Sequence, residues 1–357
     1  MDFIRISYLA PDHIISYRAL YVDIVCSIIP EYLVKEKKFD PMEYPGDAMD
    51  ITSYLSLQGY RDAQFLLNCI EEEELDNFVL LLRTVRLWAK ANYVFSSTFG
   101  FLSGITCAIM ALYILKKNDC QVTTDIVSMI RSFFRTFAEW PFPEAIRVPM
   151  TTTDSVVRQT IRWDEHTKTR DTHHSMVVLA PSQQNTTASV TDSHIEYMQK
   201  LLQEASKCID DICNSRIKFS ELFAKNDEFF HSYREYVVVT CESSANASEQ
   251  EKWSTFVRSR MAKVSSRISM NRKVGEAVNL ARTFRDESTF RTVFIIGICV
   301  KTSTTLDLNA VFTELKQEVS DDATDITVKT LSFTRVHRCN LSRYVPGLER
   351  GVKKKNR

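Results

Sequence analysis

The chain has 357 residues, of which 44% are hydrophobic and 25% are charged, and its 45 basic residues are matched by 45 acidic ones. This composition is typical of a globular protein with two or three domains, and the neutral total charge indicates no particular partner. The 8 glycines argue against a glycine-rich phosphate loop, and the 9 scattered cysteines, with no C-x-x-C pair, argue against a disulfide framework. The first residues lack the cationic start and apolar run of a secretory signal peptide.

Residues 1–72 have a mixed pattern. Apolar and polar side chains alternate over Ile4–Tyr8, which predicts a strand, while Tyr17–Tyr32 has the spacing of a helix. Proline and glycine indicate a loop over Phe39–Asp50. We expect the acidic run Glu71–Glu74 to be a solvated turn or the start of a helix rather than a metal site.

The next segment is helical. Apolar residues recur at helical spacing over 76–89, and further helices are predicted over Phe99–Leu115, Asp125–Phe137 and Ile195–Phe223. Residues 144–190 are rich in Thr and Ser, which predicts loops. The Phe99–Leu115 run is apolar all round but shorter than the roughly 20 residues of a bilayer span. We expect a buried core helix there, with a membrane span as the alternative.

Strands alternate with helices in the last third of the chain. Strands are predicted over Tyr236–Thr240, Val293–Lys301 and Ile326–Val336, and helices over Glu249–Ile268 and Asp307–Val319. This alternation favours a compact α/β sandwich with the split-βαβ topology of RNA-recognition modules.

Asp, Glu and His side chains gather in the predicted loop over 164–174. Their spacing matches no metal-binding motif, so we expect a polar surface loop and no metal site.

A series of motifs runs along nearly the whole chain. In order they are Asp76–Phe78, Arg86–Lys90, Phe99–Gly104, Trp140–Pro143, Trp163–Asp164, Met176–Pro181, Gln183–Thr186, Phe219–Phe223, Phe229–Phe230, Tyr233, Tyr236, Trp253, Phe256–Val257, Ser259–Arg260, Phe294–Gly297, Val336, Arg338, Leu341 and Pro346. Their order and spacing resemble those of the eukaryotic nuclear poly(A) polymerases.

The resemblance implies an α+β protein. It implies a remnant of a nucleotidyltransferase palm over 1–72, a helical central domain over 73–224, and a compact RNA-recognition-like α/β domain over 225–348. A basic tail would follow over 349–357.

The resemblance also places a nucleotide site in the helical domain. Its residues in this chain are Arg86, Phe95, Ser97, Gly104 and Ile105, with Gln58 at the position of an upstream family Asn. Arg86 keeps the charge of a family Lys that reaches the triphosphate. Phe95 lacks the hydroxyl of a family Tyr, and Ser97 is shorter than a family Asn. The resemblance therefore implies ATP binding at an eroded site, with helix packing as the alternative role of Phe95.

Catalysis in this family requires three Asp that hold two Mg²⁺ or Mn²⁺ ions. A Gly-Ser motif and two of these Asp precede the point in the family where this chain begins. Aligning Asp2–Ile6 with the strand that carries the third Asp puts Ser7 in its place, and a neutral Ser cannot replace a carboxylate ligand. We therefore name no catalytic residue and expect a truncated or degenerate relative, while its standing as an enzyme stays open.

Basic residues accumulate toward the C-terminus. Those named as RNA contacts are Arg258, Arg260, Lys263, Arg335, Arg338, Lys353, Lys354 and Lys355. Between 258 and 291 the only acids are Glu276, Asp286 and Glu287. An excess of cations is typical of phosphate-binding surfaces, and a solvated helix face is the alternative.

Three functions remain open. The first is a poly(A) polymerase-like protein of RNA 3′-end polyadenylation that binds RNA, and ATP weakly. The second is an active polynucleotide adenylyltransferase whose catalytic residues lie upstream, and the third is a non-catalytic interaction scaffold. The family implies RNA 3′ ends or poly(A) and 3′-end processing factors as partners, no membrane, and a nuclear location, with the cytoplasm as the alternative.

Overall fold

The computed structural model describes the chain in eleven ranges. They are 13–17, 20–24, 27–29, 51–117, 125–148, 174–224, 227–243, 246–286, 288–301, 306–322 and 330–348. The strand expected over Ile4–Tyr8, the loop over Phe39–Asp50, Ser7, most of the 164–174 cluster and Lys353–Lys355 lie outside them.

An antiparallel hairpin comes first, made of β1 (His13–Tyr17) and β2 (Leu20–Ile24). The helix expected over Tyr17–Tyr32 is therefore wrong. The two strands are rich in Ile, Val, Leu and Tyr, which suit extended backbone.

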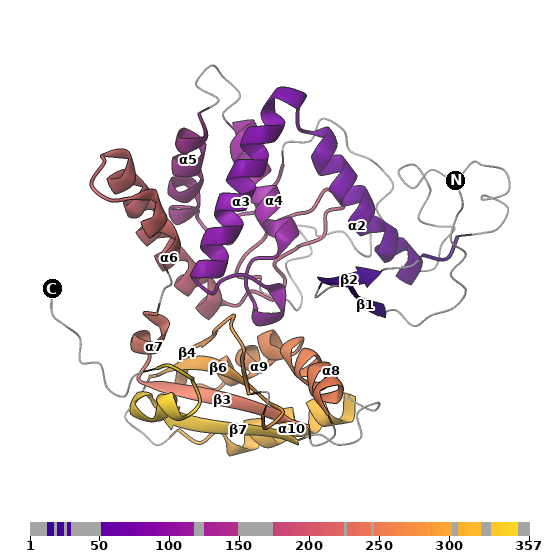
Figure 1. The fold of residues 1–357 in the computed structure, drawn as a ribbon, viewed down its shortest axis with the longest axis vertical. Helices are drawn as coiled ribbons and strands as arrows, with labels where there is room; N and C mark the ends of the chain where they lie inside the picture. Colours follow the sequence, from indigo (N-terminus) through magenta and orange to yellow (C-terminus); the bar gives the residue numbers. More distant parts are fainter. Residues whose placement is uncertain are drawn as a thin grey trace.

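The helical domain follows, drawn in indigo to pink in Figure 1. Its elements are α2 (Ile51–Asn68), η2 (Glu72–Glu74), α3 (Leu75–Ala91), η3 (Ser97–Phe99), α4 (Gly104–Lys117), α5 (Ile126–Ala138), α6 (Asp192–Cys213) and η5 (Phe219–Phe223). Trp88 of α3 packs edge-on against Phe134 of α5, with ring centroids 5.1 Å apart. The acidic run starts a helix, as expected: Glu71, Glu72 and Glu73 are exposed, and the half-buried Glu74 pairs with Lys116.

Helix α4 lies in this core, because Cys107, Ile109 and Leu112 are fully buried. The core-helix expectation is confirmed, although the helix begins at Gly104 rather than Phe99. Among the described residues no helix is both long and apolar enough to cross a bilayer.

Two other helix boundaries differ from expectation. Helix α6 ends at Cys213, and Ser215 then adopts a left-handed conformation with φ 57°, which stops the helix before the aromatic residues of η5. Helix α2 was not expected at all.

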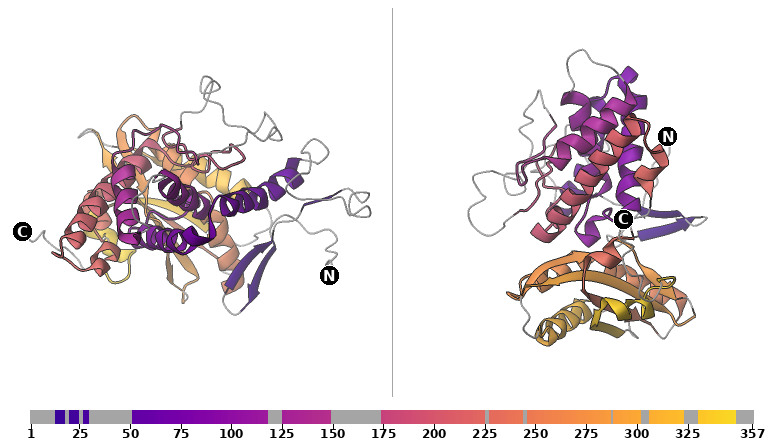
Figure 2. Two further views of the ribbon diagram at one scale, coloured as in Figure 1. Left: turned by 90° about the horizontal axis from the view of Figure 1, so that it is seen from above. Right: turned by 90° about the vertical axis from the view of Figure 1, so that its left-hand side faces the viewer.

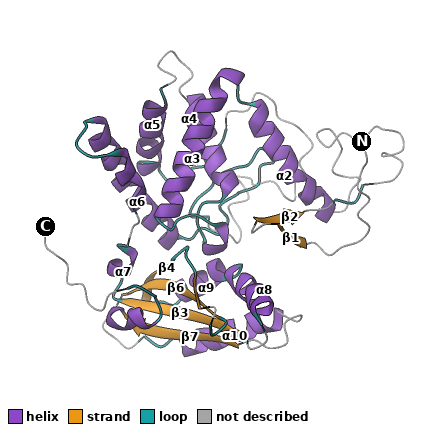
Figure 3. Ribbon diagram, in the orientation of Figure 1, coloured by secondary structure: helices purple, strands orange, loops and turns teal. Residues whose placement is uncertain are grey.

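The C-terminal domain contains the five-stranded sheet, the larger group of orange strands in Figure 3. Its elements are α7 (Phe229–Ser232), β3 (Glu235–Glu242), α8 (Ala247–Arg258), α9 (Met261–Ser269), β4 (Val274–Asn279), β5 (Phe284–Asp286), β6 (Arg291–Val300), α10 (Asn309–Asp322), β7 (Thr330–His337) and η6 (Arg338–Arg343). The helix expected over Glu249–Ile268 is divided into α8 and α9.

The sheet has the order β4-β6-β3-β7, with every neighbouring pair antiparallel and β5 added beside β6. Because α8 and α9 connect β3 to β4, and α10 connects β6 to β7, the topology is the expected split βαβ. On one face Phe312 of α10 stacks on Phe333 of β7.

The opposite face of the sheet is also covered. A Cβ atom on Gly297 of β6 would lie 2.2 Å from the ring of Tyr233, so this aromatic side chain rests directly on the strand. Tyr236 of β3 is fully buried and donates its hydroxyl to the carbonyl of Phe229 in α7. Leu341 of η6 is fully buried as well.

The two domains meet along β4, an edge strand of the sheet, and Figure 2 shows them stacked. The N-terminus of α6 lies against this edge, where the Ala277 amide donates to Ser193 Oγ at 3.2 Å. The buried side chain of Asn279 donates to the carbonyls of Phe99 (3.0 Å) and Met261 (3.1 Å), one from each domain. His194 lies beside this amide, and burial lowers its pKa to about 3.

Candidate nucleotide and RNA sites

A tight turn after α3 builds the candidate nucleotide site. The Ser96 amide donates to the Leu102 carbonyl at 2.9 Å, and the Leu102 amide donates to the Val94 carbonyl at 3.3 Å. Phe95 and Leu102 therefore form a β-bridge. This bridge carries Phe95 back toward Gly104, the first residue of α4.

Two cations lie over the Phe95 ring. The guanidinium carbon of Arg86 is 5.6 Å from the ring centroid, and Lys90 Nζ is 5.2 Å from it. Both residues are exposed on α3, and neither forms an ion pair with another described residue. Like charges four residues apart on a helix repel each other, so an anion bound between them would be stabilising. Lys90 was not among the expected site residues, although its spacing from Arg86 puts it on the same helix face.

The N-terminus of α4 is the second part of the site. Gly104 is exposed, and a Cβ atom there would meet nothing within 4 Å. The Thr106 amide donates to Ser103 Oγ at 3.2 Å. Ile105 is half-buried and packs against the core, while Ser97 is exposed and its carbonyl accepts from Ser189. The structure thus brings Arg86 and Phe95 together, and it places Ser97 in the same turn.

A buried polar cluster ties α2 to the loop that follows residue 174. Asp62 accepts from the amide and the hydroxyl of Ser182, both at 2.8 Å, and from Gln58 Nε2 at 3.4 Å. Burial raises the Asp62 pKa, and the Ser182 hydrogen bonds oppose this effect. Gln58 Oε1 is buried and has no hydrogen-bond partner among the described residues.

These residues fit part of a nucleoside triphosphate. Arg86, Lys90 and the start of α4 suit phosphates, and the Phe95 ring suits a planar base. The fit to divalent metal is poorer, because the described residues contain no group of three His, Cys, Asp or Glu side chains that could hold an ion. When bound, Mg²⁺ would supply charge neutralisation of the phosphates.

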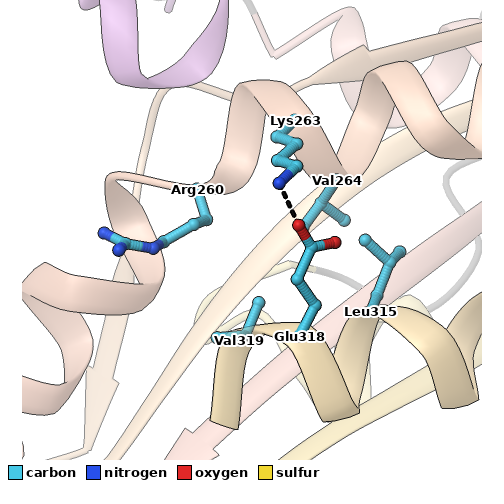
Figure 4. Close-up of a pocket in the computed structure, with 6 residues that line it drawn as sticks. All are labelled: Arg260, Lys263, Val264, Leu315, Glu318 and Val319. Atoms are coloured by element: carbon cyan, nitrogen blue, oxygen red, sulfur yellow. Dashed lines mark hydrogen bonds and ion pairs between the residues drawn. The ribbon is translucent and has the colours of Figure 1, made fainter. Parts of the chain in front are cut away.

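Five basic residues of the C-terminal domain form ion pairs, among them Lys263 and Arg335, which were expected to contact RNA. The pairs are Lys263–Glu318, Arg267–Glu314, Arg285–Glu251, Arg291–Glu242 and Arg335–Glu235. The acidic partners come from α8, α10 and β3, elements that lie outside the basic stretch of sequence. The expectation that these cations face few acids is therefore wrong for these five residues. Figure 4 shows the Lys263–Glu318 pair between α9 and α10.

Other expected RNA contacts lie elsewhere. Arg258 and Arg260 are half-buried at the end of α8. Arg338 is exposed, and its guanidinium donates to the carbonyl of His231 at 3.0 Å. RNA-recognition modules stack bases on aromatic side chains of an open sheet face. Here the face opposite the helices carries buried Val238 and Ile295 beneath α7, so it offers no such surface.

Two family models match the chain. The model of the poly(A) polymerase central domain matches residues 77–225, and the poly(A) polymerase predicted RNA binding domain matches residues 228–293. The first range covers α3 to η5 of the helical domain, and the second covers the C-terminal domain from α7 to the start of β6.

Three curated relatives are similar over much of the chain. Nuclear poly(A) polymerase 1 of Arabidopsis thaliana is 26% identical over 77% of this chain and 37% of its own length. Poly(A) polymerase PAPalpha of Candida albicans is 26% identical over 70% of this chain and 42% of its own. Poly(A) polymerase pla1 of Schizosaccharomyces pombe is 27% identical over 64% of this chain and 39% of its own.

A helical domain followed by a split-βαβ domain is the order in which the two family models match this chain. The chain belongs to the poly(A) polymerase family, of which it carries the central domain and the RNA-binding domain. It spans about two fifths of the length of these relatives.

Proposed function

We propose that this chain binds the 3′ ends of RNA, or poly(A), in nuclear polyadenylation, together with 3′-end processing factors. The observation that carries the proposal is the hydrogen-bonded junction of the two domains at Asn279. It brings the turn of Phe95 and Ser97, with its two cations, next to α9 of the C-terminal domain.

Phosphate contacts supply most of the RNA affinity in this proposal. Arg258, Arg338 and the tail residues Lys353–Lys355 are the cations that we assign to it. Lys263 and Arg335 contribute less, because Glu318 and Glu235 already compensate their charges.

ATP binding at Arg86, Phe95, Ser97, Gly104 and Ile105 is the second part of the proposal, and we expect it to be weak. Phe95 can stack but cannot donate a hydrogen bond, and the short side chain of Ser97 is exposed in η3. Residues 1–72 would be what remains of a palm, and the 73–224 and 225–348 segments would act as the central and RNA-recognition-like domains.

Two other functions compete with this one. In the first, the chain is part of an active adenylyltransferase whose catalytic carboxylates lie elsewhere in a longer protein. In the second it is an interaction scaffold without RNA affinity. Primer extension by the chain with ATP and Mg²⁺ or Mn²⁺ tests catalysis directly, and we expect none from residues 1–357.

A titration of labelled oligo(A) with the full chain, followed by fluorescence anisotropy at several salt concentrations, tests the proposed function. Binding through phosphates releases counterions, so log affinity should fall by about 0.7 per log unit of salt for each phosphate neutralised. Replacing Lys353–Lys355 with Ala should flatten this slope without changing the preference among sequences. Absence of binding at low salt would leave the scaffold as the better account.

A further inference from the structure

The backbone is strained on both sides of Phe95. Tyr93 and Ser96 have φ angles of 57° and 134°, in the region that residues other than glycine rarely adopt. Among the described residues only five besides glycine have a positive φ, so two of them in one turn concentrate strain there. Such conformations persist only where the surrounding contacts enforce them.

Contacts from the C-terminal domain hold Tyr93 in this conformation. The Arg282 guanidinium donates through Nη1 to the Tyr93 hydroxyl at 3.0 Å, and its carbon lies 5.6 Å from the centroid of the same ring. The Ala281 amide donates to the Tyr93 carbonyl at 3.3 Å. The side chain and the backbone of Tyr93 are therefore both bound by the segment between β4 and β5.

Arg282 is itself anchored in the sheet-containing domain. Its guanidinium carbon lies 4.9 Å from the ring centroid of Phe284, a buried residue of β5. Its amide donates to the Leu280 carbonyl at 2.7 Å, and the fully buried Leu280 donates in turn to the Ile295 carbonyl of β6 at 2.9 Å. The contact with Tyr93 therefore originates from the sheet.

Tyr93 determines where Phe95 lies, because it is only two residues away. Val94 between them is fully buried, and its carbonyl accepts from the Leu102 amide at 3.3 Å. The Phe95 ring is the group over which Arg86 and Lys90 lie. Rotation of the backbone at Tyr93 would redirect the turn that follows, so the ring would leave the two cations of α3.

We propose that Arg282 is a positioning residue of the candidate nucleotide site. Anchored in the C-terminal domain, it keeps Tyr93 in the left-handed conformation and thereby keeps Phe95 beside Arg86. This inference rests on ATP binding as part of the proposed function, and it adds that the C-terminal domain controls that binding. The nucleotide site is then complete only when the two domains are in contact.

Direct attraction of phosphate is the other role that the Arg282 charge suggests, because its side chain is exposed. Tyr93→Phe separates the two roles, since it removes the hydroxyl that Arg282 holds and leaves the charge in place. Arg282→Met removes both, and Arg282→Lys keeps a donor and a charge. Arg272→Met is the matched control, at an exposed residue between α9 and β4.

Hydrogen exchange of the full chain, followed by mass spectrometry of peptides over 93–102, measures opening of the turn. The amides of Ser96, Phe101 and Leu102 are hydrogen-bonded inside it. We expect exchange about tenfold faster in Arg282→Met and in Tyr93→Phe, a factor equal to about 1.4 kcal/mol and within the range for one hydrogen bond.

The remaining variants test whether this effect comes from one contact. The double variant Tyr93→Phe with Arg282→Met should exchange no faster than either single variant, because both remove the same hydrogen bond. Arg282→Lys should recover most of the protection, and Arg272→Met should stay within about twofold of wild type. Peptides from α5 should exchange alike in all variants.

Titration of each variant with mant-ATP, a fluorescent ATP derivative, measures the effect on the nucleotide site. Only the formed turn is competent to bind, so the affinity should fall with the fraction of chains that keep it. We expect a loss of about twofold or more that is equal in Arg282→Met and Tyr93→Phe and is recovered in Arg282→Lys.

Unchanged exchange of the turn in Arg282→Met would overturn the inference, as would faster exchange with unchanged mant-ATP affinity. A loss of affinity in Arg282→Met that is absent from Tyr93→Phe would also overturn it, in favour of direct phosphate contact. If the wild-type chain binds no mant-ATP while the exchange results hold, the proposed nucleotide site fails and the control of the turn by Arg282 stands.

Discussion

Replacement of Asn279 by Ala should lower the free energy of unfolding, and it should also allow the two domains to unfold separately. Asn279 is fully buried, and its amide nitrogen donates to the Phe99 carbonyl in one domain and the Met261 carbonyl in the other. Alanine leaves two buried carbonyl oxygens without this donor. An unsatisfied buried polar group costs about 1–3 kcal/mol, so we expect a loss of about 3 kcal/mol in the free energy of unfolding.

Urea unfolding, followed by both tryptophan fluorescence and far-UV circular dichroism, measures this loss. The wild-type domains share the Asn279 junction and should unfold in one transition, whereas the variant should show two. Asn309→Ala is the control, because Asn309 is exposed at the start of α10 and should change stability by less than about 0.5 kcal/mol. A loss in Asn279→Ala no larger than in this control would refute the assigned role of the amide.

Three further predictions concern stability and ligand affinity. The His194 pKa is lowered from 6.5 to about 3 by burial, so the unfolded chain takes up a proton first as the pH falls. The free energy of unfolding should therefore drop by about 1.4 kcal/mol per pH unit between about pH 6 and 4, and His194→Gln should remove this slope in urea titrations at several pH values. Gly297→Ala should lower the free energy of unfolding by about 3 kcal/mol, because the new Cβ atom meets the Tyr233 ring; a thermal melt no different from wild type would contradict this contact. The double change Phe95→Tyr and Ser97→Asn should raise ATP affinity in calorimetric titrations, and no gain would mean that the pocket is placed wrongly.

Much of the fold followed from periodicity. The helices beginning near Asp76 and Asp125 and the strands around Val238 and Ile295 bury mainly apolar side chains, so spacing alone located them. Periodicity did not predict helix α2, because this helix buries polar side chains. Asp62 accepts hydrogen bonds from Ser182 and Gln58 rather than packing in an apolar core.

Helix ends were predicted less well, for a local reason. Neither the break between α8 and α9 nor the end of α6 is marked by glycine or proline. Ser259 and Arg260 separate the first two helices, and Ser215 adopts a positive φ without being glycine. Such conformations are set by tertiary contacts, which periodicity does not contain.

In the candidate sites, contacts between residues close in sequence were also predicted better than contacts between distant segments. The resemblance to the poly(A) polymerases grouped Arg86 and Phe95 in one site, and in the structure the Arg86 guanidinium carbon lies 5.6 Å from the Phe95 ring centroid. The pairing of Lys263 with Glu318 joins segments far apart in sequence, so counting charges within one stretch overstated the free cations.

The covered sheet restricts where RNA can contact the C-terminal domain. Split-βαβ RNA-binding domains use the face opposite their helices, and here Tyr233 and the residues around Leu341 lie on that face. The β4 edge is occupied by the start of α6. On the helical side, α9 is joined to the Phe99 turn through Asn279. We therefore expect RNA contacts of the C-terminal domain on the side of α9, which adjoins the candidate nucleotide turn.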